Sequence, residues 1–224
     1  MKTILLKLSG TLLAENNKDL IVSVAQQIKA LHPEYCFSIV IGGGNILRGA
    51  KSTHIKRTTA DNMGMLATLI NGLMLHDIFS ANNINTCLMS AIHAPDIVKT
   101  ITQHSIDKAL EKNQCIIFAG GTGNPYFSTD TNAVIRALQI NATQVWKATN
   151  VDGIYTADPA KDKTSTLVKK ISHEQVLGQK LEILDATAII LAQQHKLPVR
   201  VFNMFAPEAL IHAAKDLNFG STIK

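Results

Sequence analysis

Short apolar runs rich in β-branched residues alternate along the chain with longer segments whose apolar residues recur at helical spacing. The short runs predict strands at residues 3–8, 37–41, 85–89, 114–119, 144–148 and 199–203. The longer segments predict helices at residues 19–31, 58–81, 130–140 and 184–195, and a last one that starts near residue 207. Such alternation indicates an α/β fold with a mainly parallel sheet that is covered on both faces.

This pattern contains no repeat and no low-complexity linker. The segment 152–166 is its most polar and turn-rich part, and it could hinge two lobes of one continuous sheet. We therefore expect a single domain over residues 1–224, with one lobe at about 1–140 and a second at about 141–224.

Three of the predicted strands end in loops of small or flexible residues. These loops are Ser9-Gly10, residues 42–45 (Gly-Gly-Gly-Asn) and residues 120–124 (Gly-Gly-Thr-Gly-Asn). In an open parallel sheet, ligands bind beyond the carboxyl ends of the strands, where glycines let backbone N–H groups approach an anion. One glycine loop can simply turn the chain, but three along one sheet edge favour a phosphate-binding site.

The sequence has no Walker A motif, no dinucleotide-binding Gly-x-Gly-x-x-Gly and no protein-kinase signature. Lys7 lies in an otherwise apolar strand, where it either faces an anion or reaches solvent from an edge strand. Asp130 would start a helix, either as a plain N-cap or as a carboxylate that orients a nearby lysine. Arg48 and Asp61 flank the entrance of the long predicted helix, and their spacing alone leaves open that they are surface charges.

Composition narrows the possible classes of function. With 46% apolar residues the chain is expected to fold, and its longest weakly polar stretch, 62–76, is shorter than the roughly 20 residues of a membrane span and contains Thr68 and Asn71. The first apolar run meets a lysine too early for a secretory signal, so we expect a cytoplasmic protein. A net charge of +5 fits small anionic ligands, whereas 5% aromatic residues without a basic cluster argue against nucleic-acid binding. The isolated cysteines at 36, 87 and 115 predict free thiols.

The loop residues belong to longer blocks that resemble the bacterial UMP kinases of the amino acid kinase superfamily. The blocks are residues 7–10 (KLSG), 42–45 (GGGN) with Arg48 and Gly49, 61–67 (DNMGMLA), 122–130 (TGNPYFSTD), 147–153 (KATNVDG), 156–162 (TADPAKD) and 195–203 (HKLPVRVFN). The triple glycine and the Ala-Asp-Pro block mark the wider superfamily. The Thr-Gly-Asn-Pro and Met-Gly-Met-Leu-Ala blocks are more specific to UMP kinases.

The resemblance implies a three-layer αβα sandwich with a mainly parallel central sheet, an acceptor-side first lobe and a nucleotide-donor-side second lobe. It implies phosphoryl transfer from ATP to UMP, with Mg²⁺ held mainly by the ATP phosphates, in a homohexamer. Two alternatives stay open: a superfamily member with a carboxylate or carbamate acceptor, and a non-catalytic nucleotide-binding protein of the same fold. The block 122–129 argues against the first, and the joint presence of Lys7, Asp130 and Asp158 argues against the second.

Residue by residue, the resemblance also implies roles in the site. The catalytic residues would be Lys7, Asp130 and Asp185. ATP would be bound by Lys7, Leu8, Ser9, Gly10, Gly44, Arg48, Thr149, Tyr155 and Asp158. UMP would be bound by Gly43, Asp61, Thr122, Gly123, Asn124, Pro125, Tyr126, Phe127, Ser128 and Thr129. No protein ligand for a metal ion is expected.

Three departures from the family pattern bear on regulation. The loops of the first lobe are shorter than in the family, notably at residues 15–19 and after Ala91. Thr11 stands where the family usually has a glutamate after Lys-Leu-Ser-Gly. Residues 58–98 contain no lysine or arginine, whereas the resembling enzymes place arginines of a GTP effector site in this segment; His76 and Cys87 occupy two of those positions. Because guanidinium groups usually hold a triphosphate, we expect GTP to activate weakly or not at all, unless the basic residues at 51, 56 and 57 replace the missing arginines.

Overall fold

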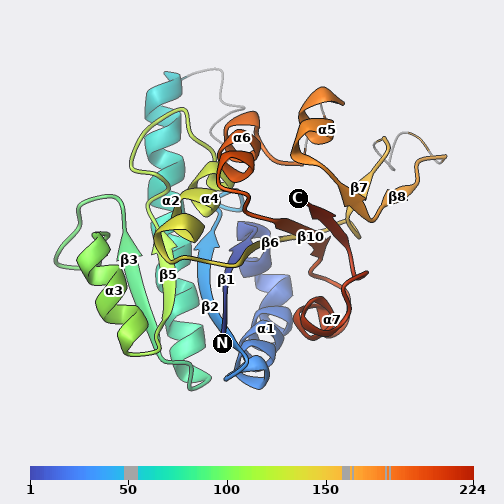
Figure 1. Cartoon of the computed structure of the whole chain (residues 1–224). Coiled ribbons are helices and arrows are strands. Elements are labelled where there is room, and N and C mark those ends of the chain that lie inside the picture. Colours follow the sequence, from blue (N-terminus) through green and yellow to red (C-terminus); the bar gives the residue numbers. More distant parts are fainter. Residues whose placement is uncertain (48–54, 158–161, 163, 180, 182) are drawn as a thin grey trace.

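Strands β1 (Lys2–Leu8) and β6 (Gln144–Thr149) lie at the centre of a sheet that has nine strands among the described residues, most of them parallel (Figure 1). The computed structural model describes residues 1–47, 55–157, 162, 164–179, 181 and 183–224. The strands of the sheet are β1 Lys2–Leu8, β2 Tyr35–Ile41, β3 Thr86–Ser90, β4 Lys99–Thr100, β5 Cys115–Ala119, β6 Gln144–Thr149, β9 Lys170–Ile171, β10 Val199–Asn203 and β11 Ser221–Ile223. In this part of the chain their order is β4-β3-β5-β2-β1-β6-β10-β11-β9, and β10–β11 is the antiparallel pair. A separate hairpin pairs β7 Ile154–Tyr155 with β8 Leu167–Val168.

Helices cover both faces of this sheet. The helices are α1 Lys18–Leu31, α2 Arg57–Ala81, α3 Gln103–Glu111, α4 Thr129–Gln139, α5 His173–Gly178, α6 Ala186–Gln194 and α7 Ala209–Lys215, with two short 3-10 helices at Gly10–Leu13 and Glu15–Asn17. Apolar residues of α1, α2 and α7 pack with one set of strand residues. Those of α3, α4, α5 and α6 pack with the alternate set. The three-layer αβα sandwich is therefore confirmed.

Alternation along the two central strands decides which side chains face helix α4. In β1, Ile4, Leu6 and Leu8 pack toward α1 and α7, whereas Leu5 packs into the α4 layer. Since side chains of a strand alternate between faces, Lys7 follows Leu5 toward α4. In β6, Val145 packs into the same layer, so Lys147 also lies on that face. The sheet thus presents two lysines to one helix layer.

The predicted elements all form, with ends that shift by one or two residues. The predicted helix 184–195 begins at Ala186, because Asp185 is its N-cap. Elements α3, α5, β4, β7, β8, β9 and β11 were not predicted from the sequence. They are nine residues or fewer, too short for an apolar period to stand out. The stretch 152–166 contains β7, and its proposed role as a hinge between two lobes stays a prediction.

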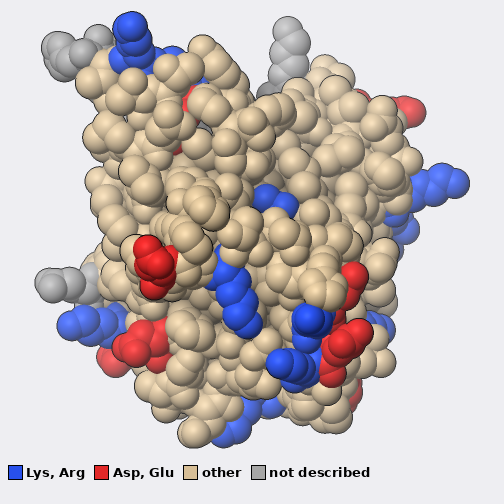
Figure 2. Space-filling model, turned by 90° about the vertical axis from the view of Figure 1, so that its left-hand side faces the viewer, with Lys and Arg blue, Asp and Glu red and all other residues tan. Residues whose placement is uncertain are grey.

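Helix α2 is the one helix in the described part of the chain that is long and apolar enough, by length and composition, to cross a membrane. In this structure it packs against β3 and β5 and belongs to one outer layer of the sandwich. Its outer side exposes a row of apolar side chains at helical spacing, namely Met63, Leu66, Ile70, Leu73 and Met74. The molecule's side that bears β3 and α3 shows broad areas without charged groups (Figure 2).

The three cysteines are free thiols, as predicted. Cys87 and Cys115 are buried, and Cys36 is half-buried.

Candidate functional site

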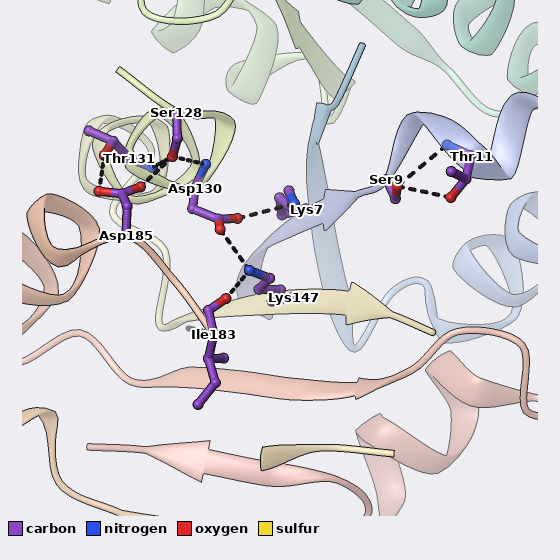
Figure 3. A network of polar contacts seen from close by, with 9 residues as sticks. All are labelled: Lys7, Ser9, Thr11, Ser128, Asp130, Thr131, Lys147, Ile183 and Asp185. Carbon is purple, nitrogen blue, oxygen red and sulfur yellow. Dashed lines mark hydrogen bonds and ion pairs between the residues drawn. The ribbon is translucent and has the colours of Figure 1, made fainter. Parts of the chain in front are cut away.

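Lys7 and Lys147 converge on the carboxylate of Asp130 (Figure 3). The two lysines are paired across β1 and β6 in the parallel register, so they start from the same level of the sheet. Lys7 Nζ lies 3.1 Å from Asp130 Oδ1, and Lys147 Nζ lies 2.6 Å from Asp130 Oδ2. Lys147 also donates a hydrogen bond to the carbonyl of Ile183. All three charged side chains are mostly buried, with 12–16% of each exposed.

The charges in this cluster shift the pKa values of Asp130 and Lys147. Burial alone would raise the pKa of Asp130, but the ammonium groups of Lys7 and Lys147 outweigh burial and hold this pKa below its ordinary value. Burial lowers the pKa of Lys147, and the nearby Asp130 carboxylate opposes that effect. Asp130 is therefore an ionised group that holds two cations, and it is poorly suited to accept a proton near neutral pH.

Helix α4 aims Asp130 at the lysines because a different residue caps the helix. Ser128 is the N-cap, and its hydroxyl accepts hydrogen bonds from the backbone N–H groups of Asp130 (3.0 Å) and Thr131 (3.2 Å). The carboxylate of Asp130 is thus free to leave the helix and reach the sheet. Of the two possibilities for Asp130, a plain N-cap or a carboxylate that orients a lysine, the structure has the second.

Asp185 lies on the other side of the first turn of α4 from Lys7 (Figure 3). It caps α6 by accepting a hydrogen bond from Ala188 N at 3.0 Å. Its carboxylate also accepts hydrogen bonds from Thr131 Oγ1, at 2.8 Å, and from Ser128 Oγ. Asp185 therefore joins the start of α6 to the start of α4, and its predicted catalytic role stays a prediction.

A cavity of about 290 Å³ opens beside the start of α4. It brings together many of the residues predicted to bind UMP, and it is lined by Gly43, Gly44, Leu47, Arg57, Ala60, Asp61, Gly64, Met65, Thr68, Gly121, Asn124, Phe127, Ser128 and Thr129. Thr122, Gly123, Pro125 and Tyr126 belong to the same loop but do not line the cavity.

Asp61 is already engaged at the wall of this cavity. Arg57 Nε lies 2.8 and 2.9 Å from its two carboxylate oxygens, and the backbone N–H of Tyr126 donates to Oδ2 at 2.8 Å. The guanidinium of Arg57 also stacks over the ring of Tyr126, 5.7 Å from its centroid. Asp61 thus ties the start of α2 to the loop that precedes α4.

A second cavity, of about 400 Å³, opens at the ends of β1 and β6. It is lined by Lys7, Ser9, Thr11, Leu12, Lys147, Ala148, Thr149, Asn150, Met204 and Phe205. Three residues predicted to bind ATP, Lys7, Ser9 and Thr149, therefore share one space. Thr11, which replaces the family's glutamate, donates a hydrogen bond from Oγ1 to Ser9 Oγ at 2.9 Å.

Other residues predicted to bind ATP lie outside this second cavity. The side chain of Leu8 is buried in the core, so that residue can offer only its backbone. Gly10 lies against the carbonyl of Gly42, where a Cβ would approach the oxygen to 2.6 Å. Tyr155 lies in the β7–β8 hairpin, and its hydroxyl is 3.4 Å from Asp152 Oδ2. Arg48 and Asp158 lie outside the described residues.

Three residues of this site were not predicted from the sequence to belong to it: Lys147, Arg57 and Thr131. The signal for Lys147 was available, because it is a lysine within a predicted apolar strand, the same property that singled out Lys7. Arg57 and Thr131 carried no such signal. Their contacts with Asp61 and Asp185 depend on loops that the sequence pattern does not position.

Comparisons with known proteins bear on this geometry. The sequence model described as the amino acid kinase family matches residues 2–203. A uridylate kinase of Protochlamydia amoebophila is 43% identical over 234 residues, which span 99% of this chain and 92% of that protein. A uridylate kinase of Escherichia coli strain K12 is 42% identical over 217 residues, which span 93% and 90%.

Solved structures give the same similarity in three dimensions. A UMP kinase from Ureaplasma parvum superimposes with a TM-score of 0.93 at 38% identity, covering 100% of this chain and 98% of that one. A UMP kinase from Bacillus anthracis superimposes with a TM-score of 0.94 at 32% identity, covering 100% and 96%. These similarities cover the whole chain and so include the residues of both cavities and of the charged cluster.

Proposed function

Because the chain belongs to the amino acid kinase family, we propose that it transfers the γ-phosphoryl group of ATP to UMP and so produces ADP and UDP. The observation that carries the proposal is the cluster of Lys7, Asp130 and Lys147. Its two lysines line the cavity of about 400 Å³, and Asp130 follows Ser128 and Thr129, which line the cavity of about 290 Å³. Relatives named uridylate kinase match over nearly the full length of the chain. The two alternatives, a carboxylate or carbamate acceptor and a non-catalytic protein, are less favoured by these relatives.

The proposed chemistry needs positioning and positive charge more than it needs a base. A phosphate monoester has a second pKa of about 6, so the attacking oxygen of UMP is already ionised near neutral pH. Asp130 is ion-paired on both oxygens, which suits a group that orients cations. We assign to Lys7 and Lys147 the stabilisation of negative charge on the transferring phosphoryl group.

On the donor side, Ser9 and Gly10 are proposed to approach the ATP phosphates with their backbones, with Leu8 beside them and Arg48 as a further cation. Gly44 lines the cavity proposed for UMP and is proposed to approach the ATP phosphates from that side. Thr149, Tyr155 and Asp158 are proposed to hold the adenosine half. The shared cavity that Ser9 and Thr149 line supports this assignment.

On the acceptor side, UMP is proposed to occupy the cavity of about 290 Å³. Gly43 would approach its phosphate, and Asp61 would accept hydrogen bonds from its ribose hydroxyls. Residues 122–129 would surround the base. Asp61 would then exchange or share its contact with Arg57, which is 51% exposed and able to move.

ATP-dependent phosphoryl transfer requires a divalent cation, and we propose Mg²⁺. Among the described residues, no group of three His, Cys, Asp or Glu side chains could hold a metal ion. Asp130, the carboxylate in the charged cluster, forms ion pairs with two lysines. The ATP phosphates would therefore supply most of the oxygen ligands that Mg²⁺ prefers.

We also propose that the chain works in the cytoplasm as a homohexamer. The exposed apolar row on α2 supports self-association, because isolated monomers rarely leave a contiguous apolar helix face in water. Analytical ultracentrifugation measures the state directly, and a monomer at micromolar concentration would contradict the proposal.

The function is tested by an assay that couples ADP release to each nucleoside monophosphate in turn. UMP is expected to be the best acceptor. CMP is expected to be poor, because cytosine replaces a hydrogen-bond acceptor of uracil with a donor. N-acetylglutamate and carbamate belong in the same panel. Faster ADP release with either of them than with UMP would reject the proposed function.

A further inference from the structure

Two polar side chains, Thr68 and Asn71, interrupt the buried face of helix α2. Thr68 is 5% exposed and Asn71 is fully buried. They are three residues apart, so they lie on the same side of the helix. A hydroxyl or an amide is costly to bury unless it is hydrogen-bonded. The partners of these two side chains therefore indicate why they are there.

Asn71 binds the glycine loop that follows β2. Its Nδ2 donates to the carbonyl of Gly42 at 2.6 Å and to Asn45 Oδ1 at 2.7 Å. Asn45 Nδ2 returns a hydrogen bond to Asn71 Oδ1 at 3.3 Å. Gly10, in the loop after β1, packs on the same groups, since a Cβ there would lie 2.9 Å from Asn71 Nδ2. One buried amide thus sets the spacing of the loops after β1 and β2.

Thr68 binds the glycine loop that follows β5. Its Oγ1 accepts a hydrogen bond from the backbone N–H of Gly120 at 2.8 Å and donates to the carbonyl of Met65 at 2.7 Å. Gly120 has a φ of 75°, a conformation that favours glycine, so the chain turns sharply at the residue that Thr68 holds. Gly120 begins the loop that leads to residues 122–129.

The same turn of α2 also supports the loop after β2. A Cβ on Gly43 would lie 2.8 Å from the carbonyl of Gly64 and 2.9 Å from Ala67 Cβ, so that glycine backbone rests directly on the helix. Thr68 and Gly64 both line the cavity proposed for UMP. Helix α2 is therefore the common support of three loops that come from different strands.

We propose that Thr68 and Asn71 are positioning residues that hold these glycine loops at the separation phosphoryl transfer requires. The proposal rests on the proposed function of the site. The contacts assign the two residues different effects. Thr68 holds Gly120, the first residue of the loop 120–128 (the acceptor loop), so it sets the affinity for UMP. Asn71 holds the loops after β1 and β2, the first of which begins two residues after Lys7, so it sets the rate of transfer.

Thr68→Val tests the first part, because valine keeps the shape of threonine and leaves the Gly120 N–H without a partner. We expect KM for UMP to rise about tenfold while kcat stays within about twofold. The loss of a buried hydrogen bond to the acceptor loop weakens UMP binding and leaves the residues that stabilise the transferring phosphoryl group in place. Thr68→Ser restores the hydroxyl and is expected to restore KM. A KM for UMP that is unchanged in Thr68→Val would overturn the role of Thr68.

Thr86→Val is a matched control at the opposite end of the sheet. It removes a hydroxyl that lies 2.6 Å from His76 Nδ1, at the start of β3. It is expected to cost stability without changing KM. An equal rise of KM in Thr86→Val and Thr68→Val would indicate a general loss of packing and would overturn the proposal.

Asn71→Asp tests the second part, because it keeps the shape but turns a donor to Gly42 into an acceptor. We expect kcat to fall about tenfold or more. Asn45→Ala removes the Asn45–Asn71 amide pair from the exposed side and leaves the bond from Asn71 to Gly42, so it tests the amide pair even if Asn71→Asp does not fold. Wild-type kcat in Asn45→Ala would overturn the role of the Asn45–Asn71 pair, and wild-type kcat in Asn71→Asp would overturn the role of the bond to Gly42.

Amide hydrogen exchange separates this proposal from the proposed function. Residues 120–124 are expected to exchange faster in Thr68→Val than in the wild-type chain, whatever the substrate is. A wild-type chain that phosphorylates no UMP would reject the proposed function alone. Unchanged exchange at residues 120–124 would reject the anchoring by Thr68.

Discussion

Lys7 and Lys147 stand opposite each other on the neighbouring parallel strands β1 and β6, and both contact the carboxylate of Asp130. Two ammonium groups at one level of a sheet repel each other, and one carboxylate neutralises only half of their charge. The cluster therefore keeps one net positive charge. That charge adjoins the cavity that Ser9 and Thr149 also line, where the proposed phosphates of ATP would lie.

Lys7→Ala is expected to lower kcat by about 100-fold or more, because it removes a cation that faces the charge developed in the transition state. UMP binding is expected to change far less. Steady-state kinetics at saturating ATP measure both values. Lys2→Ala, at the exposed start of the same strand, is the control and should leave kcat unchanged. A Lys7→Ala enzyme with most of its kcat would remove Lys7 from the mechanism.

Asp130→Asn is expected to lower the free energy of unfolding by about 3 kcal/mol at pH 7, because two mostly buried lysines lose their counter-charge. The pKa of Asp130 is below its ordinary value in the folded state, so its contribution is present above the unfolded pKa of about 4 and is lost as pH falls through the folded value.

Urea unfolding of the wild-type chain and of Asp130→Asn across pH measures the difference between their free energies of unfolding. This difference should be constant from pH 5 to 8 and should become smaller below about pH 4. A difference that grows as the pH falls would contradict the ion-paired state of Asp130.

Asp61→Ala is expected to reduce the preference for UMP over dUMP, because a carboxylate placed for a ribose hydroxyl discriminates against a substrate that lacks one. The ratio of kcat/KM for the two nucleotides is the measurement. Asp61 also anchors Tyr126, so Asp61→Ala should raise KM for both substrates. Equal kcat/KM for UMP and dUMP in the wild-type enzyme would place Asp61 elsewhere.

GTP is expected to activate the enzyme weakly or not at all. His76 and Cys87 occupy two positions where the resembling enzymes have effector arginines. The ring of His76 forms a hydrogen bond with Thr86, and Cys87 is buried. Neither supplies the permanent, forked charge that holds a triphosphate. Initial rates across millimolar GTP at fixed ATP and UMP are the measurement. Saturable, several-fold activation would mean that other basic residues have taken over the effector site.

The sequence predicts the elements that are long or in which apolar residues recur at a regular spacing. Strands such as β1 and helices such as α2 follow from their patterns, and three glycine loops at one sheet edge indicate the binding site. The short helix α5 and the two-residue strands have no such period. The two-residue strands form by pairing with other segments, such as β7 with β8 and β9 with β11.

The sequence predicts the glycine loops of the site, but it predicts few of the contacts between the polar side chains. Lys7 and Asp130 stand out from the sequence, but their meeting depends on the register of β1 with β6 and on Ser128 as the helix cap. Thr68 and Asn71 look, in the sequence, like polar interruptions of an apolar segment. Only the packed structure gives them partners in loops 29 and 52 residues away.

The kcat of Lys147→Met tests the account of the charged cluster most directly, because the sequence pattern did not single out this lysine and its role rests on geometry. Methionine keeps much of the side-chain length and removes the charge. We expect kcat for UDP formation to fall about 100-fold, with little added loss in the double variant Lys7→Ala/Lys147→Met, since the two lysines act on one group. A Lys147→Met enzyme that keeps kcat within about twofold of the wild-type value would contradict the account.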